Sequence, residues 1–181
     1  MNQMEVEALK IGVIGYSGSI NKEPVKPLEN ICEELGKEIA KRGHTLVSGG
    51  RDGIMELVSK SAKEAGGLVI GILPGLENGN DHLTFGVKTD MDFAMRSILM
   101  MYNVDVVISI GGKAGTALEL FAAYGHSIPI FLLRGTGGWT DRITKVLLEG
   151  KYLDERKSVE LKSVWSVEEF MEEIEKMEDK I

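Results

Sequence analysis

Apolar and polar residues are arranged along this chain in two alternating patterns. Short apolar runs bounded by glycine, proline and polar turn residues are typical of buried strands. These runs cover residues 10–15, 45–48, 68–73, 85–89, 105–110, 128–132 and 159–164. Between them, apolar residues recur with the 3.6-residue period of a helix. This second pattern predicts helices over residues 27–42, 53–65, 92–103, 116–125 and 140–148, and a last helix capped by Ser166.

Strands that alternate with helices predict a parallel sheet with helices on both faces. No internal repeat or linker interrupts the pattern, so we expect a single doubly wound, mainly parallel, Rossmann-like α/β domain over residues 1–181. In such a sheet, ligands bind at the carboxyl ends of the strands. Four glycine-rich loops follow predicted strands, at 15–19, 49–53, 111–115 and 135–138. Because these loops share one edge of the sheet, the sequence predicts a ligand site there.

The loop after the strand 105–110 carries the most specific signal. Its glycine turn leads into a helix, whose N-terminus offers free backbone N–H groups and a positive dipole end to an anion such as phosphate. Glu119 follows about one helical turn later, on the face shared with the loop. The loop is not a Walker A motif, because Lys113 is followed by Ala114. The predicted phosphate-binding residues are Gly111, Gly112, Lys113, Gly115 and Thr116.

Two further loops are candidates for holding a nucleotide. The small residues and hydroxyl groups of the loop 15–19 would admit a base or a sugar, although a plain strand-to-helix turn explains that loop, and a turn with a helix cap explains the loop 49–53, as well. The loop 15–19 lacks the dinucleotide-binding fingerprint. Asp52 is expected to cap the following helix. The candidate nucleotide-binding residues are Gly15, Ser17, Gly18, Gly49, Gly50 and Arg51, and the arginine would face either a phosphate or the solvent.

Arg96 lies in the methionine-rich segment 92–103, which is apolar on nearly all sides. Two interpretations are open: a surface arginine on an interface helix, or a charge placed at a ligand anion. The apolar residues around it are typical of a core or a subunit interface. We therefore expect a homodimer or a higher homo-oligomer.

Composition narrows the possible partners. Apolar residues make up 43% of the chain and charged residues 27%, the net charge is −7, and no basic stripe with interleaved aromatic residues occurs, so nucleic acid is not an expected partner. No apolar run approaches the roughly 20 residues that span a bilayer. Residues 1–10 lack the apolar core of a signal peptide, and Cys32 is the single cysteine, so we expect a cytoplasmic protein. His44, His82 and His126 lie far apart, and no metal site is predicted.

The segments 48–55, 91–96 and 111–119 resemble the LOG-like Rossmann-fold family over roughly residues 10–148. That family comprises nucleoside 5′-monophosphate phosphoribohydrolases and relatives often labelled "possible lysine decarboxylase". The resemblance implies that Arg96 and Glu119 form a catalytic pair, and that the glycine loop before Glu119 holds the phosphate. No lysine is placed as an evident pyridoxal-phosphate Schiff base, so a pyridoxal-phosphate decarboxylase is not expected.

The chain departs from the family pattern at three places. Ser97 replaces a lysine, Ile110 replaces a proline, and the glycine loop is one residue longer. These features, with Trp139, are similar to the branch that includes molybdenum-cofactor carrier proteins. The resemblance therefore implies a carrier or sensor, with no required cofactor, that binds a nucleoside monophosphate or a molybdopterin-like ligand. The alternative is a nucleoside 5′-monophosphate phosphoribohydrolase that cleaves the N-glycosidic bond with Arg96 and Glu119. The third hypothesis is a scaffold protein, in which the glycine loops only turn the chain.

Overall fold

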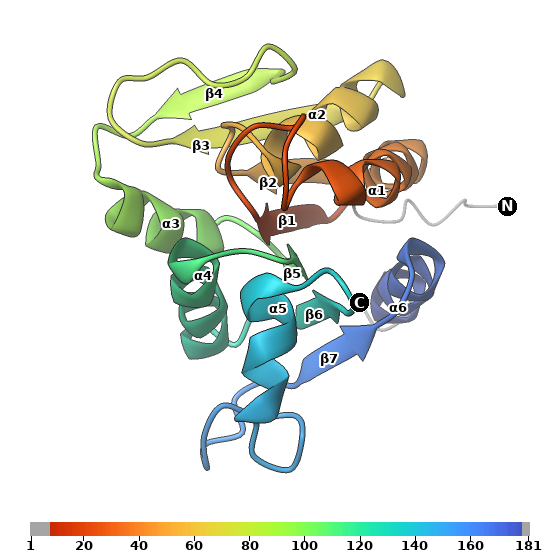
Figure 1. Ribbon diagram of the computed structural model, residues 1–181, viewed down its shortest axis with the longest axis vertical. Helices are drawn as coiled ribbons and strands as arrows, with labels where there is room; N and C mark the ends of the chain where they lie inside the picture. The colour runs from red at the N-terminus through yellow and green to blue at the C-terminus, as the bar shows by residue number, and fades with distance from the viewer. Residues whose placement is uncertain (1–7, 179–181) are drawn as a thin grey trace, which may run out of the picture.

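Seven strands of the described residues, 8–178, form one sheet in which each neighbouring pair is parallel in this computed structural model (Figure 1). The strands are β1 (Lys10–Gly15), β2 (Thr45–Ser48), β3 (Leu68–Leu73), β4 (Phe85–Lys88), β5 (Val106–Ile110), β6 (Ile130–Leu133) and β7 (Leu161–Val164). Their order across the sheet is β4-β3-β2-β1-β5-β6-β7. From β1 the sheet is extended first on one side, through β2 to β4, and then on the other side, through β5 to β7. The topological switch point therefore lies between β1 and β5, where such sheets form a crevice for a ligand.

Helices cover both faces of the sheet, as predicted for a doubly wound α/β domain (Figure 1). One face carries α1 (Glu29–Lys41), α2 (Ile54–Glu64) and α6 (Val167–Glu178). The other face carries α3 (Phe93–Met101), α4 (Ala114–Gly125) and α5 (Gly138–Arg142). A short 3-10 turn, η1 (Lys26–Leu28), precedes α1, and another, η2 (Ile143–Lys145), follows α5. The predicted domain of residues 1–181 also includes residues 1–7 and 179–181, which lie outside the described residues.

Alternate residues of each central strand enter two separate cores. Val13 packs toward α1, α2 and α6, whereas the next residue, Ile14, packs toward α3 and α4. Ile108 and Val107 divide in the same way. This is the period-two alternation of a strand with both faces buried, and it explains why these strands read as continuous apolar runs.

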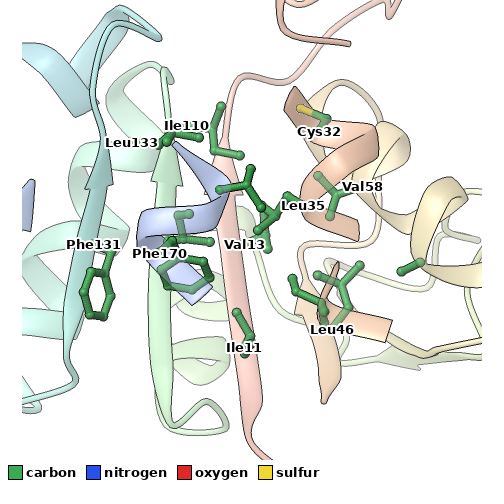
Figure 2. Close-up of a cluster of buried hydrophobic side chains, with 14 of the residues drawn as sticks. Ile11, Val13, Cys32, Leu35, Leu46, Val58, Ile110, Phe131, Leu133 and Phe170 are labelled. Atoms are coloured by element: carbon green, nitrogen blue, oxygen red, sulfur yellow. The ribbon is translucent and has the colours of Figure 1, made fainter. Parts of the chain in front are cut away.

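Figure 2 shows the first core, with side chains from β1, β2, β5 and β6 meeting those of α1, α2 and α6. Phe131 and Phe170 pack edge to face, with ring centroids 5.2 Å apart. Cys32 belongs to this core, as its place on the apolar stripe of a helix predicts. Burial raises the pKa of its thiol to about 12, so it is not an activated nucleophile.

Three predicted boundaries are wrong in ways that matter locally. The helix predicted over 140–148 is the five-residue α5 followed by η2, which ends at Lys145, and the β-branched residues Ile143, Thr144 and Val146 in this segment are weaker helix formers. The helix predicted to start at residue 116 starts at Ala114. Asp52 does not cap α2, because the capping position belongs to Gly53, which has a φ of 68°.

We predict that Gly36→Ala destabilises the fold. A Cβ at Gly36 would overlap the carbonyl oxygen of Val58 and lie 2.9 Å from the amide nitrogen of Ala62, because α1 and α2 pack closely there. We expect a loss of about 1–3 kcal/mol in the free energy of unfolding, measured by urea titration. The matched control is Gly125→Ala at the end of α4, where no atom lies within 4 Å of the added Cβ. Equal effects at the two positions would contradict the close packing of α1 on α2.

Candidate functional site

A pocket of about 160 Å³ lies at the carboxyl edge of the sheet, where the strand order breaks between β1 and β5. Its walls come from the end of β1, the turn between β2 and α2, the helix α3, and the start of α4. The structure thus brings together residues that are up to 106 positions apart, from Val13 to Glu119. The predicted site residues that line it are Gly15, Ser17, Gly49, Arg51, Arg96, Lys113, Gly115, Thr116 and Glu119.

Arg96 is buried at this site rather than exposed on a surface helix. Only 5% of the residue is accessible to solvent, and its Nε and Nη1 atoms are buried without a hydrogen-bond partner. The side chain fits because residue 49 is a glycine, since a Cβ there would overlap the guanidinium. Burial lowers the pKa of Arg96, and the nearby charges of Glu119 and Arg51 act in opposite directions on it. A guanidinium with unused donors inside a pocket is suited to binding an anion.

Glu119 projects from α4 into the same pocket and is also buried, with 8% of its surface accessible. Its Oε1 accepts a hydrogen bond of 2.8 Å from the hydroxyl group of Ser97 on α3. Burial raises the pKa of this carboxyl group, whereas the Ser97 hydrogen bond and the charge of Arg96 lower it. Arg96 and Glu119, both within the described residues, form no ion pair within 4 Å. The charges of Arg96 and Glu119 therefore shift each other's pKa, but the buried Nε and Nη1 donors of Arg96 stay unpaired.

The N-terminus of α4 forms another wall of the pocket, with Lys113, Gly115 and Thr116 in the lining. The helix begins at Ala114 after Lys113, so the amides of Ala114, Gly115 and Thr116 have no partner within the helix. The hydroxyl group of Thr116 donates to the carbonyl oxygen of Gly15 at 3.1 Å and ties this helix end to β1. The resulting arrangement of free amides at a helix N-terminus is one that binds phosphate.

Gly111 and Gly112, which were predicted to bind phosphate, do not line the pocket. The amide of Gly111 donates to the hydroxyl group of Thr136 at 2.8 Å and is therefore already used. Side chains at these two positions would overlap the ring of Tyr16 and the side chain of Thr116. Their positive φ values, 64° and 97°, and this lack of space explain why glycine is present.

None of the residues of the glycine loop 135–138 lines the pocket, and this loop and the start of α5 instead hold the loop before α4. The amide of Trp139 donates to the carbonyl oxygen of Gly112 at 3.0 Å, and Thr140 donates to that of Gly111 at 2.7 Å. The loop's own amides, at Gly135 and Gly137, donate to the carboxylate of Asp141. An anion-binding turn is thus present there, but a side chain of the same protein occupies it.

Gly18 and Gly50, predicted to contact a nucleotide, also lie outside the pocket lining. Gly50 packs against Gly71 of β3, where a Cβ would lie 2.8 Å from the Cα atom. Several lining residues were missed as site residues because they are apolar or had another assignment in the sequence. Ser97 was visible only as a departure from the family pattern, and Asp52 was assigned as a cap. The missed lining residues are Val13, Ile14, Asp52, Met55, Phe93, Ser97 and Leu118.

Neither a metal-binding group of side chains nor a membrane-spanning helix occurs within residues 8–178. No group of three or more His, Cys, Asp or Glu side chains in this range is arranged to hold a metal ion. None of the helices described has the length and apolar character needed to cross a membrane.

Sequence comparison relates the chain to several curated proteins, including the following two. An uncharacterized protein from Archaeoglobus fulgidus is 38% identical over 119 residues, which are 65% of this chain and 75% of that protein. A cytokinin riboside 5′-monophosphate phosphoribohydrolase from Rhodococcoides fascians is 31% identical over 96 residues, 50% of this chain and 48% of the enzyme. The match therefore spans about half the length of that phosphoribohydrolase.

Several solved structures match this chain over nearly its full length. The crystal structure of a structural-genomics target is 55% identical, with a TM-score of 0.92, and the match covers 93% of this chain and 99% of that one. The molybdenum cofactor binding protein from Rippkaea orientalis is 28% identical, with a TM-score of 0.77 and coverage of 94% and 98%. The Moco carrier protein from Chlamydomonas reinhardtii is 28% identical, with a TM-score of 0.78 and coverage of 97% and 100%.

These similarities confirm the predicted resemblance to LOG-like proteins and to the branch with molybdenum-cofactor carriers. The model of one family, described as the SLOG cluster4 family, matches residues 8–170. Because this match covers most of the chain, the protein belongs to the SLOG cluster4 family.

Proposed function

We propose that the pocket binds a phosphorylated, nucleotide-like small molecule and that the protein acts as a carrier or sensor of it. The observation that carries this proposal is the guanidinium of Arg96, which is buried with unpartnered Nε and Nη1 atoms. A buried charge without partners costs several kcal/mol, and an anionic ligand would remove that cost. Three cationic side chains line the pocket, Arg51, Arg96 and Lys113, against the two carboxylates of Asp52 and Glu119.

The phosphate group would sit at the N-terminus of α4. The amides of Ala114, Gly115 and Thr116 are available there, and Lys113 adds a positive charge at the mouth. Gly115 has no atom within 4 Å of a Cβ position, which leaves room for a ligand atom beside the helix end. Arg96 would hold the adjoining part of the ligand or share its phosphate.

A nucleoside monophosphate and a molybdopterin-like molecule are the two ligand classes that fit this proposal. The names of the similar proteins support them, since one relative acts on a cytokinin riboside 5′-monophosphate and solved neighbours bind or carry the molybdenum cofactor. The carrier role is preferred here because Ser97 and the longer glycine loop are similar to the carrier branch, which matches this chain over nearly its full length.

Hydrolysis of the N-glycosidic bond is the second candidate, and the position of Glu119 favours it. Its carboxylate lies in the same pocket as Arg96, with Oε1 engaged by Ser97. In this reaction the bond from C1′ of the ribose to the base nitrogen breaks, water adds to C1′, and the base leaves with a proton. An ionised Glu119 would stabilise the positive charge that develops on the sugar and orient the water.

Removal of the Arg96 charge should weaken ligand binding. We expect Arg96→Met to bind AMP at least tenfold more weakly than the wild type in calorimetric titration, because a buried charge pair with phosphate is worth about 2–5 kcal/mol. The control is Arg142→Met, which removes an exposed arginine of α5 outside the pocket. If Arg96→Met bound AMP as tightly as the control, the anion would lie elsewhere.

A product assay separates carrier from hydrolase. We expect purified protein to leave AMP and other nucleoside monophosphates intact, as judged by chromatography for free base, while Glu119→Gln still binds AMP. The amide of glutamine keeps an acceptor for Ser97 but has no charge to stabilise a cationic sugar. Base release by the wild type that disappears in Glu119→Gln would replace the carrier proposal with the hydrolase.

We also propose that the protein is a homodimer or a higher homo-oligomer assembled through α3 and α4, which pack side by side (Figure 1). Four large apolar residues on these helices or at their ends are more than half exposed: Phe93, Met95, Tyr102 and Phe121. Exposed large apolar side chains on two packed helices are typical of an interface. Phe93 of α3 and Leu118 of α4 also line the pocket.

Sedimentation at micromolar concentration should show a dimer or a larger species. We expect Phe121→Glu to shift the protein toward the monomer, since a charge in an apolar interface is costly to bury. Val146→Glu places the same charge at another exposed apolar residue, outside α3 and α4, and should leave the assembly unchanged. A wild-type monomer, or equal effects of the two variants, would contradict the assembly.

A further inference from the structure

A second pocket adjoins the first across Arg51 and Asp52, which line both. It has a volume of about 340 Å³ and lies between the start of α2 and the loop that follows β3. The loop is fixed in place, because the amide of Asn80 donates to the carbonyl oxygen of Gly50 and its side-chain amide donates to that of Arg51, both at 2.8 Å. The second pocket thus has walls that are held against the first one.

The size of the first pocket makes an extension necessary. Sites for small ligands usually enclose about 300–1,000 Å³, whereas the first pocket measures about 160 Å³. A phosphate and a sugar fill such a space, and a base or pterin ring has to lie outside it. The buried, unpartnered nitrogen atoms of Arg96 make the first pocket suited to an anion, so we place the ligand's anionic end there.

Two directions lead out of the first pocket. Phe93 and Leu118 mark the side toward the apolar surface of α3 and α4, which the proposed subunit interface would cover. Arg51 and Asp52 mark the other side, which opens into the second pocket. None of the exposed apolar residues of α3 and α4 proposed for the interface lines the second pocket.

The second pocket is rich in hydrogen-bond acceptors, although Arg51 also brings donors to it. Its carboxylates come from Asp52, Glu56, Glu77 and Asp81, and the amide of Asn78 can accept or donate. In the part of the chain that the structure describes, the Asp52 carboxylate accepts no hydrogen bond and joins no ion pair. Amino groups and ring N–H groups of a heterocycle are the donors that match such a surface.

Arg51 stands between the two pockets with a planar group suited to a ring. Its guanidinium lies 4.9 Å from the centre of the Phe93 ring and forms an ion pair of 3.4 Å with Glu77. Both contacts are partly exposed, so they hold the side chain weakly. A flat heterocycle could stack on the same guanidinium that now faces Phe93.

We infer that the second pocket is the subsite for an amino-bearing heterocycle, a purine or pterin ring, whose phosphate end occupies the first pocket. This inference rests on the proposed function and adds to it which class of ring the site accepts. Arg51 would stack on the ring, and the carboxylates would select rings that carry amino groups. The loop after β3 would then be the determinant of which phosphorylated ligand the protein accepts.

Calorimetric titrations with three ligands test the subsite: ribose 5-phosphate, AMP, and purine riboside 5′-monophosphate, which lacks the amino group of AMP. We expect AMP to bind at least tenfold more tightly than ribose 5-phosphate, and the ligand without the amino group to bind at least fivefold more weakly than AMP. Chromatography of the titrated samples checks that AMP stays intact; if base is released, the same titrations use Glu119→Gln.

Two variants locate the base. The double variant Glu56→Gln, Asp81→Asn removes two charges that line only the second pocket, and Asn78→Trp fills that pocket from an exposed loop position. Both should lower the preference for AMP over ribose 5-phosphate to less than threefold while the affinity for ribose 5-phosphate changes less than twofold. Glu34→Gln and Lys37→Trp, in the cleft between α1 and α2, are the matched controls and should change neither affinity.

The outcomes separate this inference from the proposed function. If neither AMP nor ribose 5-phosphate binds, the proposed function fails and the subsite fails with it. If both bind with equal affinity, or if the variants leave the preference for AMP intact, the phosphate site stands and the second pocket is not the base subsite.

Discussion

The buried guanidinium of Arg96 is the constraint on which the site depends. A cation that is 5% exposed, with two unpartnered nitrogen atoms, is tolerated only if the surrounding fold holds it in place. Two features do so. Residue 49 must be glycine for the guanidinium to lie beside the β2–α2 turn, and α3 must start with its backbone fixed, which Asp92 achieves by accepting the amide of Met95 at 2.9 Å. Under the proposed function, an anion bound to Arg96 would offset the free-energy cost of burying the guanidinium, which is a common relation between stability and function.

A second layer of hydrogen bonds holds the N-terminus of α4 and the loop before it in place. That loop is held by Thr136 of the next glycine loop and by Trp139 and Thr140 of α5, and α4 itself is tied to β1 through Thr116. Asp141 in turn fixes that next loop by accepting two of its amides. Helix-end amides held in this way need no reorganisation when a ligand arrives, which favours affinity. Gly111 and Gly112 in this turn therefore serve packing, whereas Gly115 and Thr116 at the start of the helix line the pocket.

Strand and helix periodicity predicted the sheet, its parallel sense and the edge at which the pocket lies, because both faces of each central strand are buried and read as apolar runs. The pairing of Arg96 with Glu119 came from the family resemblance. The sequence could not distinguish loop amides that are free from those already used, since the partners of Gly111 are 25 and 29 residues away. It could not reveal that Ser97 contacts Glu119 across two helices, nor that Arg51 and Asp52 separate two pockets, because these relations arise from helix packing and loop placement.

The protonation state of Glu119 is the property that would differ between a binding site and a catalytic site. Burial raises the pKa of its carboxyl group, and the Ser97 hydrogen bond and the Arg96 charge oppose that effect. A phosphate anion bound to Arg96 would offset the guanidinium charge and so raise the pKa of Glu119 further. Stabilising a cationic sugar requires the ionised form, whereas a binding site can use a protonated Glu119 as a hydrogen-bond donor to the ligand. The Ser97 hydroxyl group, which favours the ionised carboxylate at 2.8 Å, is therefore the contact on which a catalytic role for Glu119 would most depend.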